Sequence, residues 1–305
     1  MASFSRYRTV LLLVAVLPLT GCLFRSHKVQ RPITVQLKSA NAQELIDYVN
    51  TQASKIQTLQ ATVDIAASVG GEKKGQVTEY ESIRGYVLAR KPEMLRMIGL
   101  FPIVRNRAFD MVSDGLTFKL WIPTKNRFIV GRNDVEMSNP TQPLENLRPQ
   151  QIYDALLLRH IDPQTEIAVM ENETGSITDA KGHKVATADY ILDIVHTGEH
   201  PFLSRKIIFS RTDLLPHGQL LYNEEGDLVT RAIYEDYREN EDVNFPWNIE
   251  IVRPQEEYNI KLTVLKLELN ESLPDDKFVL EQPPGVEVVH LDKTQASSAA
   301  HSESH

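Results

Sequence analysis

The sequence is poor in cysteine, and that scarcity limits how the chain can be held together. Cys22 is the only cysteine in 305 residues, so no intramolecular disulfide can form and the fold must depend on its core. Long hydrophobic runs are missing as well. No segment after Cys22 approaches the roughly 20 apolar residues that a membrane-spanning helix needs. Positive charge is not in excess, since the formal net charge is -8 at pH 7, which argues against nucleic acid as a partner.

The common catalytic and metal-binding motifs are also missing. The sequence contains no Gly-x-Ser-x-Gly, no His-Glu-x-x-His, no phosphate loop and no dinucleotide glycine fingerprint. His196 and His200 flank a glycine after a predicted strand, and the sequence indicates no third ligand for them. The acidic stretch 234–242 lacks the spacing of a calcium-binding EF-hand loop. We therefore expect no enzyme activity, no cofactor and no metal site.

The first 22 residues have the pattern of an export signal. Arg6 and Arg8 precede an apolar stretch, residues 10–19, which is too short to span a bilayer. Leu-Thr-Gly at 19–21 directly before Cys22 resembles the lipobox that lipoprotein signal peptidase cleaves. The resemblance implies that residues 1–21 are a signal peptide and that Cys22 is lipidated. The alternative is a signal peptide with an unrelated cysteine nearby.

Lipidation of Cys22 would anchor the protein to a membrane that its polypeptide chain does not span. Several acyl chains attach a protein durably to a membrane, whereas a single acyl chain binds only marginally. Leu23 follows the cysteine, and in the enteric bacterial pattern the lack of Asp there implies export to the outer membrane. We expect a lipid-anchored outer-membrane protein whose domain faces the periplasm. Residues 22–40 would form the lipidated N-terminus and tether, 41–290 one domain, and 291–305 a disordered polar tail.

The domain combines two helical patterns with many β patterns. Apolar residues recur at helical spacing over 41–59, and Asn41 and Glu44 have the positions of a capping box. A shorter helix is predicted over 150–158. Alternating apolar segments between turn residues predict antiparallel strands, with a bulge near Val264 where the alternation changes phase. The predicted strands are 62–69, 82–88, 94–98, 107–112, 116–122, 127–130, 166–170, 188–195, 204–210, 217–222, 228–237, 247–252 and 258–269.

Several short motifs in this domain resemble those of a known family. They are, in chain order, Arg84-Gly85-Tyr86, Arg90-Lys91-Pro92, Leu95-Arg96, Ser113-Asp114-Gly115, Trp121-Ile122-Pro123, Phe278 and Pro283-Pro284-Gly285-Val286. This pattern resembles the LolA/LolB-like carriers of bacterial lipoproteins, a family that also includes lipid-binding lipoproteins and the regulator RseB. The resemblance implies a mainly β fold, a half-open antiparallel β-barrel with covering helices and an apolar cavity for acyl chains. Its implied partners are the membrane, acyl lipid or lipoprotein cargo and a periplasmic carrier protein.

Alternation along the strands predicts which side chains face the covered side of the sheet. If the cavity lies on that face, the acyl-binding candidates are Leu95, Met97, Phe109, Met111, Leu116, Phe118, Leu120, Ile122, Leu192, Ile194, Ile207 and Phe209. The alternative is ordinary packed core, because apolar alternation does not distinguish a filled interior from a ligand cavity.

Two arginines and one loop are further candidates by resemblance. Family carriers hold a helical lid closed with a strand arginine, for which Arg96 and Arg84 are candidates, although arginine is rarely buried unpaired and surface roles are favoured. We expect Leu100 and Phe101 to be exposed at the tip of the turn 99–103, as candidates for a loop that contacts the membrane. In the receptor branch of the family a hydrophobic loop at a similar place enters the membrane. The alternative is a loop folded over one open end of the barrel.

Three functions are compatible with these patterns. The first is a membrane-anchored periplasmic lipoprotein that binds acyl chains, for lipoprotein sorting or transfer to the outer membrane. The second is an envelope-stress sensor or structural lipoprotein that uses the same fold to bind a protein. The third is an enzyme that acts on envelope lipid. It requires a set of polar catalytic residues in the cavity, and the sequence does not identify one. We expect the first function.

Overall fold

The computed structural model describes residues 36–133, 148–178, 184–240 and 242–291. These residues fall into two compact units: Gly175–Thr187 belong to a small unit, and Gln36–Thr174 with the described chain from Ala188 onward form the larger one. No helix within the described ranges is long and apolar enough to cross a membrane. The predicted signal peptide 1–21, Cys22, most of the tether and nearly all of the tail 291–305 lie outside the described residues.

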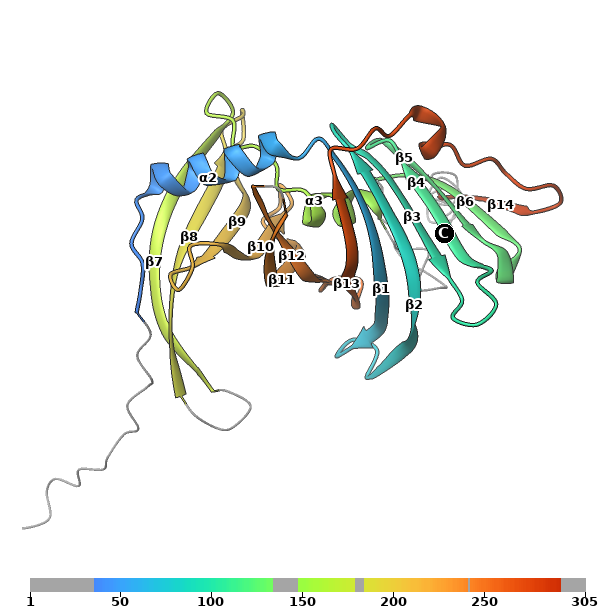
Figure 1. Cartoon of the computed structure of the whole chain (residues 1–305), viewed down its shortest axis with the longest axis horizontal. Coiled ribbons are helices and arrows are strands. Elements are labelled where there is room, and N and C mark those ends of the chain that lie inside the picture. Colours follow the sequence, from blue (N-terminus) through green and yellow to red (C-terminus); the bar gives the residue numbers. More distant parts are fainter. Residues whose placement is uncertain (1–35, 134–147, 179–183, 241, 292–305) are drawn as a thin grey trace, which may run out of the picture. The chain divides into compact units, whose positions relative to one another are not determined.

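Strands make up most of the described chain and join in one open sheet (Figure 1). Its strand order is β14-β6-β5-β4-β3-β2-β1-β13-β12-β11-β10-β9-β8-β7. The strands between β6 and β8 in this order pair antiparallel, whereas β14 pairs with β6 in parallel. The strands are β1 (Thr58–Gly71), β2 (Gln76–Arg90), β3 (Met94–Leu100), β4 (Arg107–Ser113), β5 (Thr117–Ile122), β6 (Arg127–Arg132), β7 (Glu166–Thr178), β8 (Lys184–His196), β9 (Phe202–Ser210), β10 (Pro216–Tyr222), β11 (Leu228–Asn240), β12 (Val243–Arg253), β13 (Tyr258–Leu269) and β14 (Glu287–His290).

The predicted mainly β fold, built on one antiparallel sheet with helices on its apolar face, is confirmed. Each predicted strand lies within an observed strand, apart from Leu116, which precedes β5. The predicted bulge is also present. The register between β1 and β13 pairs Thr62 with Lys266 but Val63 with Val264, so one residue of β13 is left over. The short strand β14 was not predicted.

The first helix begins where its cap predicts and ends earlier than its apolar pattern suggests. In α2 (Ala42–Lys55), Asn41 Oδ1 accepts a hydrogen bond from the Glu44 amide at 3.0 Å, and Glu44 Oε2 accepts one from the Asn41 amide at 2.8 Å. The predicted end at residue 59 is wrong, because Ile56 already has an extended backbone. The Gln57 amide then donates a hydrogen bond to the Asn270 side chain at 2.8 Å, directly before β1 begins at Thr58.

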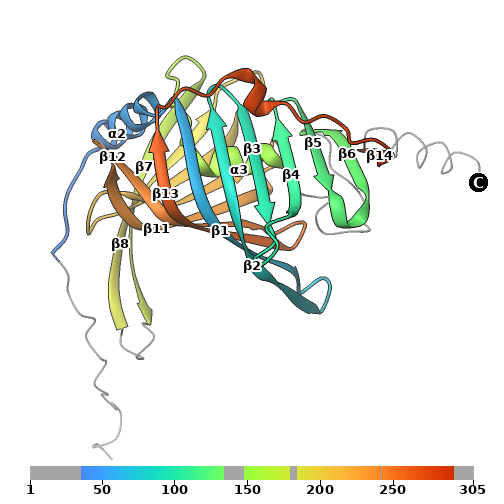
Figure 2. The ribbon, with the colours of Figure 1, turned by 45° about the vertical axis from the view of Figure 1, so that its right-hand side comes forward.

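Both helices pack on the same face of the sheet, here called the inner face. Its residues face each other across strand pairs in one row: Leu192, Ile207, Gln219, Ala232, Ile251, Ile260 and Ala67. Leu45 and Val49 of α2 pack on the β8 and β9 part of this face. The helix α3 (Pro149–Leu156) packs into the core formed by β1 to β6 and β11 to β13, and within the larger unit the sheet curves around it (Figure 2).

Replacing Val49 by Asn tests the packing of α2. Val49 is fully buried against Leu192 and Ile207, so an amide there would lack a hydrogen-bond partner. We expect the variant to lose about 2–4 kcal/mol of unfolding free energy in urea. The control is Thr51→Asn on the exposed side of the same helix, which should change stability by less than about 0.5 kcal/mol. Equal unfolding midpoints for the two variants would contradict this packing.

Candidate functional site

The inner face of the larger unit contains an apolar cavity of about 350 Å³. Its walls come from β1 to β5 and β13, and its buried or half-buried apolar lining includes Ile65, Ala67, Ile83, Met97, Phe109, Ile122, Tyr258 and Ile260. The charged lining residues Glu81 and Lys125 are exposed. A concave apolar site with few polar groups is suited to binding an apolar ligand.

Small inner-face residues leave room for this cavity. Gly99 lies on β3 opposite Phe109 of β4. A Cβ atom at Gly99 would lie 2.4 Å from Phe109 Cε1 and 2.7 Å from Ile83 Cδ1. The missing side chain therefore allows the Phe109 ring and the Ile83 side chain to lie over β3 and form the wall. Ala67 on β1 similarly leaves space where a larger residue would fill it.

The structure divides the predicted acyl-binding residues, apart from Leu116, into three groups. Met97, Phe109 and Ile122 line the apolar cavity. A second group is fully buried core around α3 and consists of Leu95, Met111, Phe118 and Leu120. The third group packs beneath α2 and consists of Leu192, Ile194, Ile207 and Phe209. The acyl-binding role stays a prediction for all of them, and the first group is the one that lines the apolar cavity.

Leu116 was predicted to face inward, and this is wrong because its side chain is 74% exposed. Gly115 has a φ of +93° and turns the chain just before β5 begins at Thr117. Asp114 Oδ1 accepts hydrogen bonds from the amides of Leu116 and Thr117. Leu116 thus belongs to an Asp-stabilised turn, in which strand alternation does not apply.

The loop between β3 and β4 exposes other residues than predicted. Leu100 is half-buried at the end of β3, and the half-buried Phe101 lines the apolar cavity. The exposed tip consists of Ile103 and Val104, whose side chains are 95% and 64% exposed. The Arg105 amide donates to the Phe101 carbonyl at 3.0 Å, which closes the turn and places its tip beyond Phe101.

The two candidate strand arginines pair with neighbouring strands. Arg96 Nη2 lies 2.8 Å from Oδ2 of the buried Asp110, and Arg84 Nε lies 2.7 Å from Asp64 Oδ1. Another arginine, Arg205 on β9, binds the segment that follows α3. This residue was not selected from the sequence. Its Nη1 donates to the Arg159 carbonyl at 2.9 Å, just after α3. A signal was available, because alternation places Arg205 in phase with the inward-facing Ile207.

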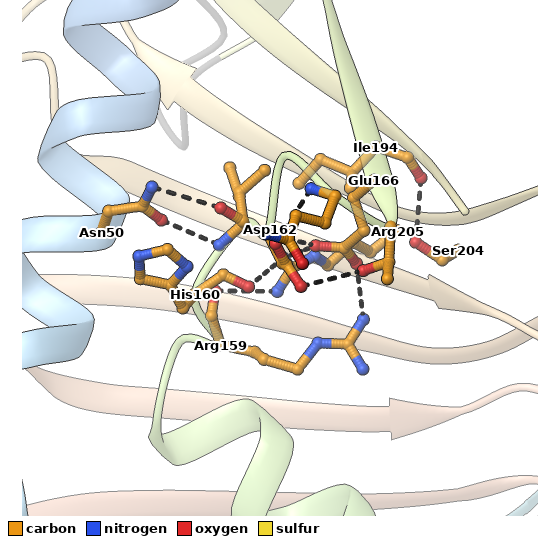
Figure 3. Close-up of polar contacts among 11 residues, drawn as sticks. Asn50, Arg159, His160, Asp162, Glu166, Ile194, Ser204 and Arg205 are labelled. Atoms are coloured by element: carbon orange, nitrogen blue, oxygen red, sulfur yellow. Dashed lines mark hydrogen bonds and ion pairs between the residues drawn. The ribbon is translucent and has the colours of Figure 1, made fainter. Parts of the chain in front are cut away.

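A buried polar cluster surrounds Arg205 (Figure 3). Arg205 Nη2 donates to the His160 carbonyl and to Glu166 Oε2, both at 3.0 Å, and Arg159 Nη2 donates to Glu166 Oε1 at 2.9 Å. Asn50 of α2 accepts from the Ile161 amide at 2.8 Å. Burial lowers the pKa of Arg205 to about 10, so its guanidinium is charged at neutral pH. The cluster joins the segment after α3 to α2, β7 and β9.

Replacing Arg205 by Met tests this cluster. The variant removes the buried one of two arginine partners of the Glu166 carboxylate, and with it three hydrogen bonds. We expect a loss of about 3–5 kcal/mol in unfolding free energy, measured in urea. The double variant Arg205→Met with Glu166→Gln should recover part of that loss, because it also removes the buried charge that Arg205 offsets. Arg84→Met, at an exposed pair, should lose less than about 1 kcal/mol. Equal effects of the two single variants would contradict a structural role for Arg205.

The two histidines with ligand-like spacing lie near the end of β8. His196 is half-buried with its ring centroid 5.5 Å from that of Phe202, and His200 is exposed. In the part of the chain that the structure describes, no group of three or more His, Cys, Asp or Glu side chains is arranged to hold a metal.

Comparisons with known proteins gave structural similarities. No protein-family description matches the sequence, and no curated protein matches it either. A LolA superfamily protein from Nitrosomonas europaea is 15% identical over 79% of this chain and 99% of its own, with a TM-score of 0.46. A domain named for outer membrane lipoprotein sorting, from Vibrio parahaemolyticus, is 12% identical over 78% of this chain and 97% of its own, with a TM-score of 0.47. A chain of the Pseudomonas aeruginosa MucA/MucB complex is 13% identical over 81% of this chain and 64% of its own, with a TM-score of 0.24. At identities of 12–15%, these similarities concern the fold.

Proposed function

We propose that this chain is a lipoprotein of the bacterial envelope that binds acyl chains in the apolar cavity of its inner face. The role we propose is sorting of lipoproteins or their transfer to the outer membrane, with acyl lipid or lipoprotein as cargo. The observation that carries the proposal is the cavity of about 350 Å³ between β1 to β5 and β13. Its buried walls are apolar, so an acyl chain would gain about 0.8 kcal/mol per buried methylene before ordering costs.

The exposed loop tip supports an approach to the membrane. Ile103 and Val104 are exposed, and Phe101 and Pro102 next to them line the apolar cavity. An apolar surface therefore continues from the loop to the cavity. We propose Ile103 and Val104 as the membrane contacts in place of Leu100 and Phe101. Phe101 would then contact the cargo.

Filling the cavity tests acyl binding. Ala67 lines the cavity, and its neighbour Ala66 does not, so Ala67→Trp and Ala66→Trp form a matched pair. We expect Ala67→Trp to weaken binding of a fluorescent fatty-acyl probe by about tenfold or more, because the indole would occupy the space of the chain. Ala66→Trp should bind nearly as the wild type does. Binding should depend little on salt, since apolar contact supplies its free energy.

If the wild-type chain binds no acyl probe, the carrier proposal fails. The protein-binding sensor would then be the better account of the same fold. Equal binding by the two tryptophan variants would place the acyl site outside this cavity.

Replacing Cys22 by Ser tests the membrane anchor. The variant removes the only thiol of the chain, so the protein should move from the membrane fraction to the soluble fraction and lose labelling by a palmitate analogue. Thr51→Ser, at an exposed position of α2, leaves the thiol in place and serves as the control, which should remain lipidated and anchored. Membrane association and labelling that persist in Cys22→Ser would contradict the anchor.

A further inference from the structure

A second cavity on the inner face differs from the first in its chemistry. It also measures about 350 Å³, and its polar lining includes Asp154, Arg159, Ser204, Arg205, Gln219 and Glu224. Its walls come from α3, the segment that follows α3, and β8 to β10. It shares no lining residue with the apolar cavity. We call it the polar cavity.

Two buried side chains in its wall have unused hydrogen-bonding atoms. Gln219 is 2% exposed, and its Nε2 donates to the Asp154 carbonyl at 3.1 Å. Arg205 is 1% exposed, and its two Nη atoms are used by the polar cluster. Within the described residues, Gln219 Oε1 and Arg205 Nε have no protein partner. A buried polar atom without a partner costs about 1–3 kcal/mol. Both atoms are closed to solvent in this arrangement, so a ligand would bond to them after a small shift of the side chains in the wall and would be stabilised by that bond.

Asp154 adds a carboxylate to the same wall as Gln219. It accepts a hydrogen bond of 3.3 Å from Gln150 Nε2, and the nearby charges of Arg159 and Arg205 favour its ionised form. Burial raises the pKa of Asp154 to about 6, so the carboxylate is mainly ionised at neutral pH. Asp154 and Gln219 Oε1 together provide acceptors for an ammonium or another strong donor.

Arg159 provides a positive charge at the same cavity. Its side chain is 63% exposed, and one of its nitrogens pairs with Glu166. The remaining donors of its guanidinium, with Arg205 Nε, suit a carboxylate or phosphate. A purely cationic ligand would lie near two guanidinium groups, and a purely anionic ligand would lie near Asp154. Only a ligand with both charges matches both parts of the wall.

We propose that the polar cavity binds a small zwitterion, with its ammonium at Asp154 and Gln219 and its carboxylate or phosphate at Arg159 and Arg205. Two sources have this chemistry: a free amino acid, and the headgroup of an ethanolamine phospholipid. The site is independent of the proposed acyl site, because the two cavities share no residue.

Isothermal titration of the purified full chain tests the proposal with matched probes. L-alanine and glycerophosphoethanolamine carry both charges, whereas ethanolamine, acetate and inorganic phosphate carry one sign each. We expect at least one zwitterion to bind at millimolar concentration and the singly charged probes to bind at least about tenfold more weakly. Tighter binding of alanine would identify the amino-acid source, and tighter binding of glycerophosphoethanolamine the headgroup.

Variants of the chain locate the site. Arg159→Gln and Asp154→Asn should each weaken zwitterion binding by about tenfold, through loss of a charge-assisted hydrogen bond. Arg159 is exposed, so its variant should fold normally even if Asp154→Asn does not. Arg84→Gln at another exposed pair is the control, and Ala67→Trp should leave zwitterion binding unchanged while it blocks the acyl site. The proposal is overturned if neither zwitterion binds, if singly charged probes bind equally well, or if Arg159→Gln binds as the wild type does.

Discussion

Among the described residues, the short helices α2 and α3 cover only part of the inner face of a sheet of fourteen strands, and this constraint shapes the molecule. The helix α2 has 14 residues and α3 has 8. The first covers part of β8 and β9, and the second packs against the central strands. Apolar surface between β1 to β5 and β13 stays open and forms the apolar cavity. The cavity thus results from the mismatch between a long sheet and its helical cover.

The positions of both helices depend on a polar cluster in a mainly apolar interior. Arg205 and Glu166 are both buried and pair at 3.0 Å. The carbonyls of Arg159 and His160 accept further hydrogen bonds from Arg205, and Asn50 ties α2 to the same segment. Burial of two charges is tolerated here because their ion pair and hydrogen bonds offset much of the cost of removing them from water. The cluster therefore specifies where the segment after α3 lies, and the polar cavity beside it uses the donors and acceptors that remain.

Strand alternation predicted most of the fold because an apolar inner face imposes a period of two. The same rule could not separate α2 from β1, since Ile56 and Leu59 fit both the helical and the strand period. Alternation also identifies a face without showing which part of it a helix fills. For this reason Leu192 and Phe209 were grouped with Met97, although α2 covers the first two and the third lines the apolar cavity. The inward position of Arg205 was not predicted, although the alternation along β9 places its side chain on the inner face. A charged residue was not expected in the core.

Native mass spectrometry of the Cys22→Ser chain, purified from a bacterial host without detergent, tests the central claim most directly. The account predicts a bound acyl lipid that is released on unfolding and is reduced in Ala67→Trp but not in Ala66→Trp. A chain that carries no lipid, and that gains none when incubated with fatty-acyl ligand after delipidation, would contradict acyl binding in the cavity.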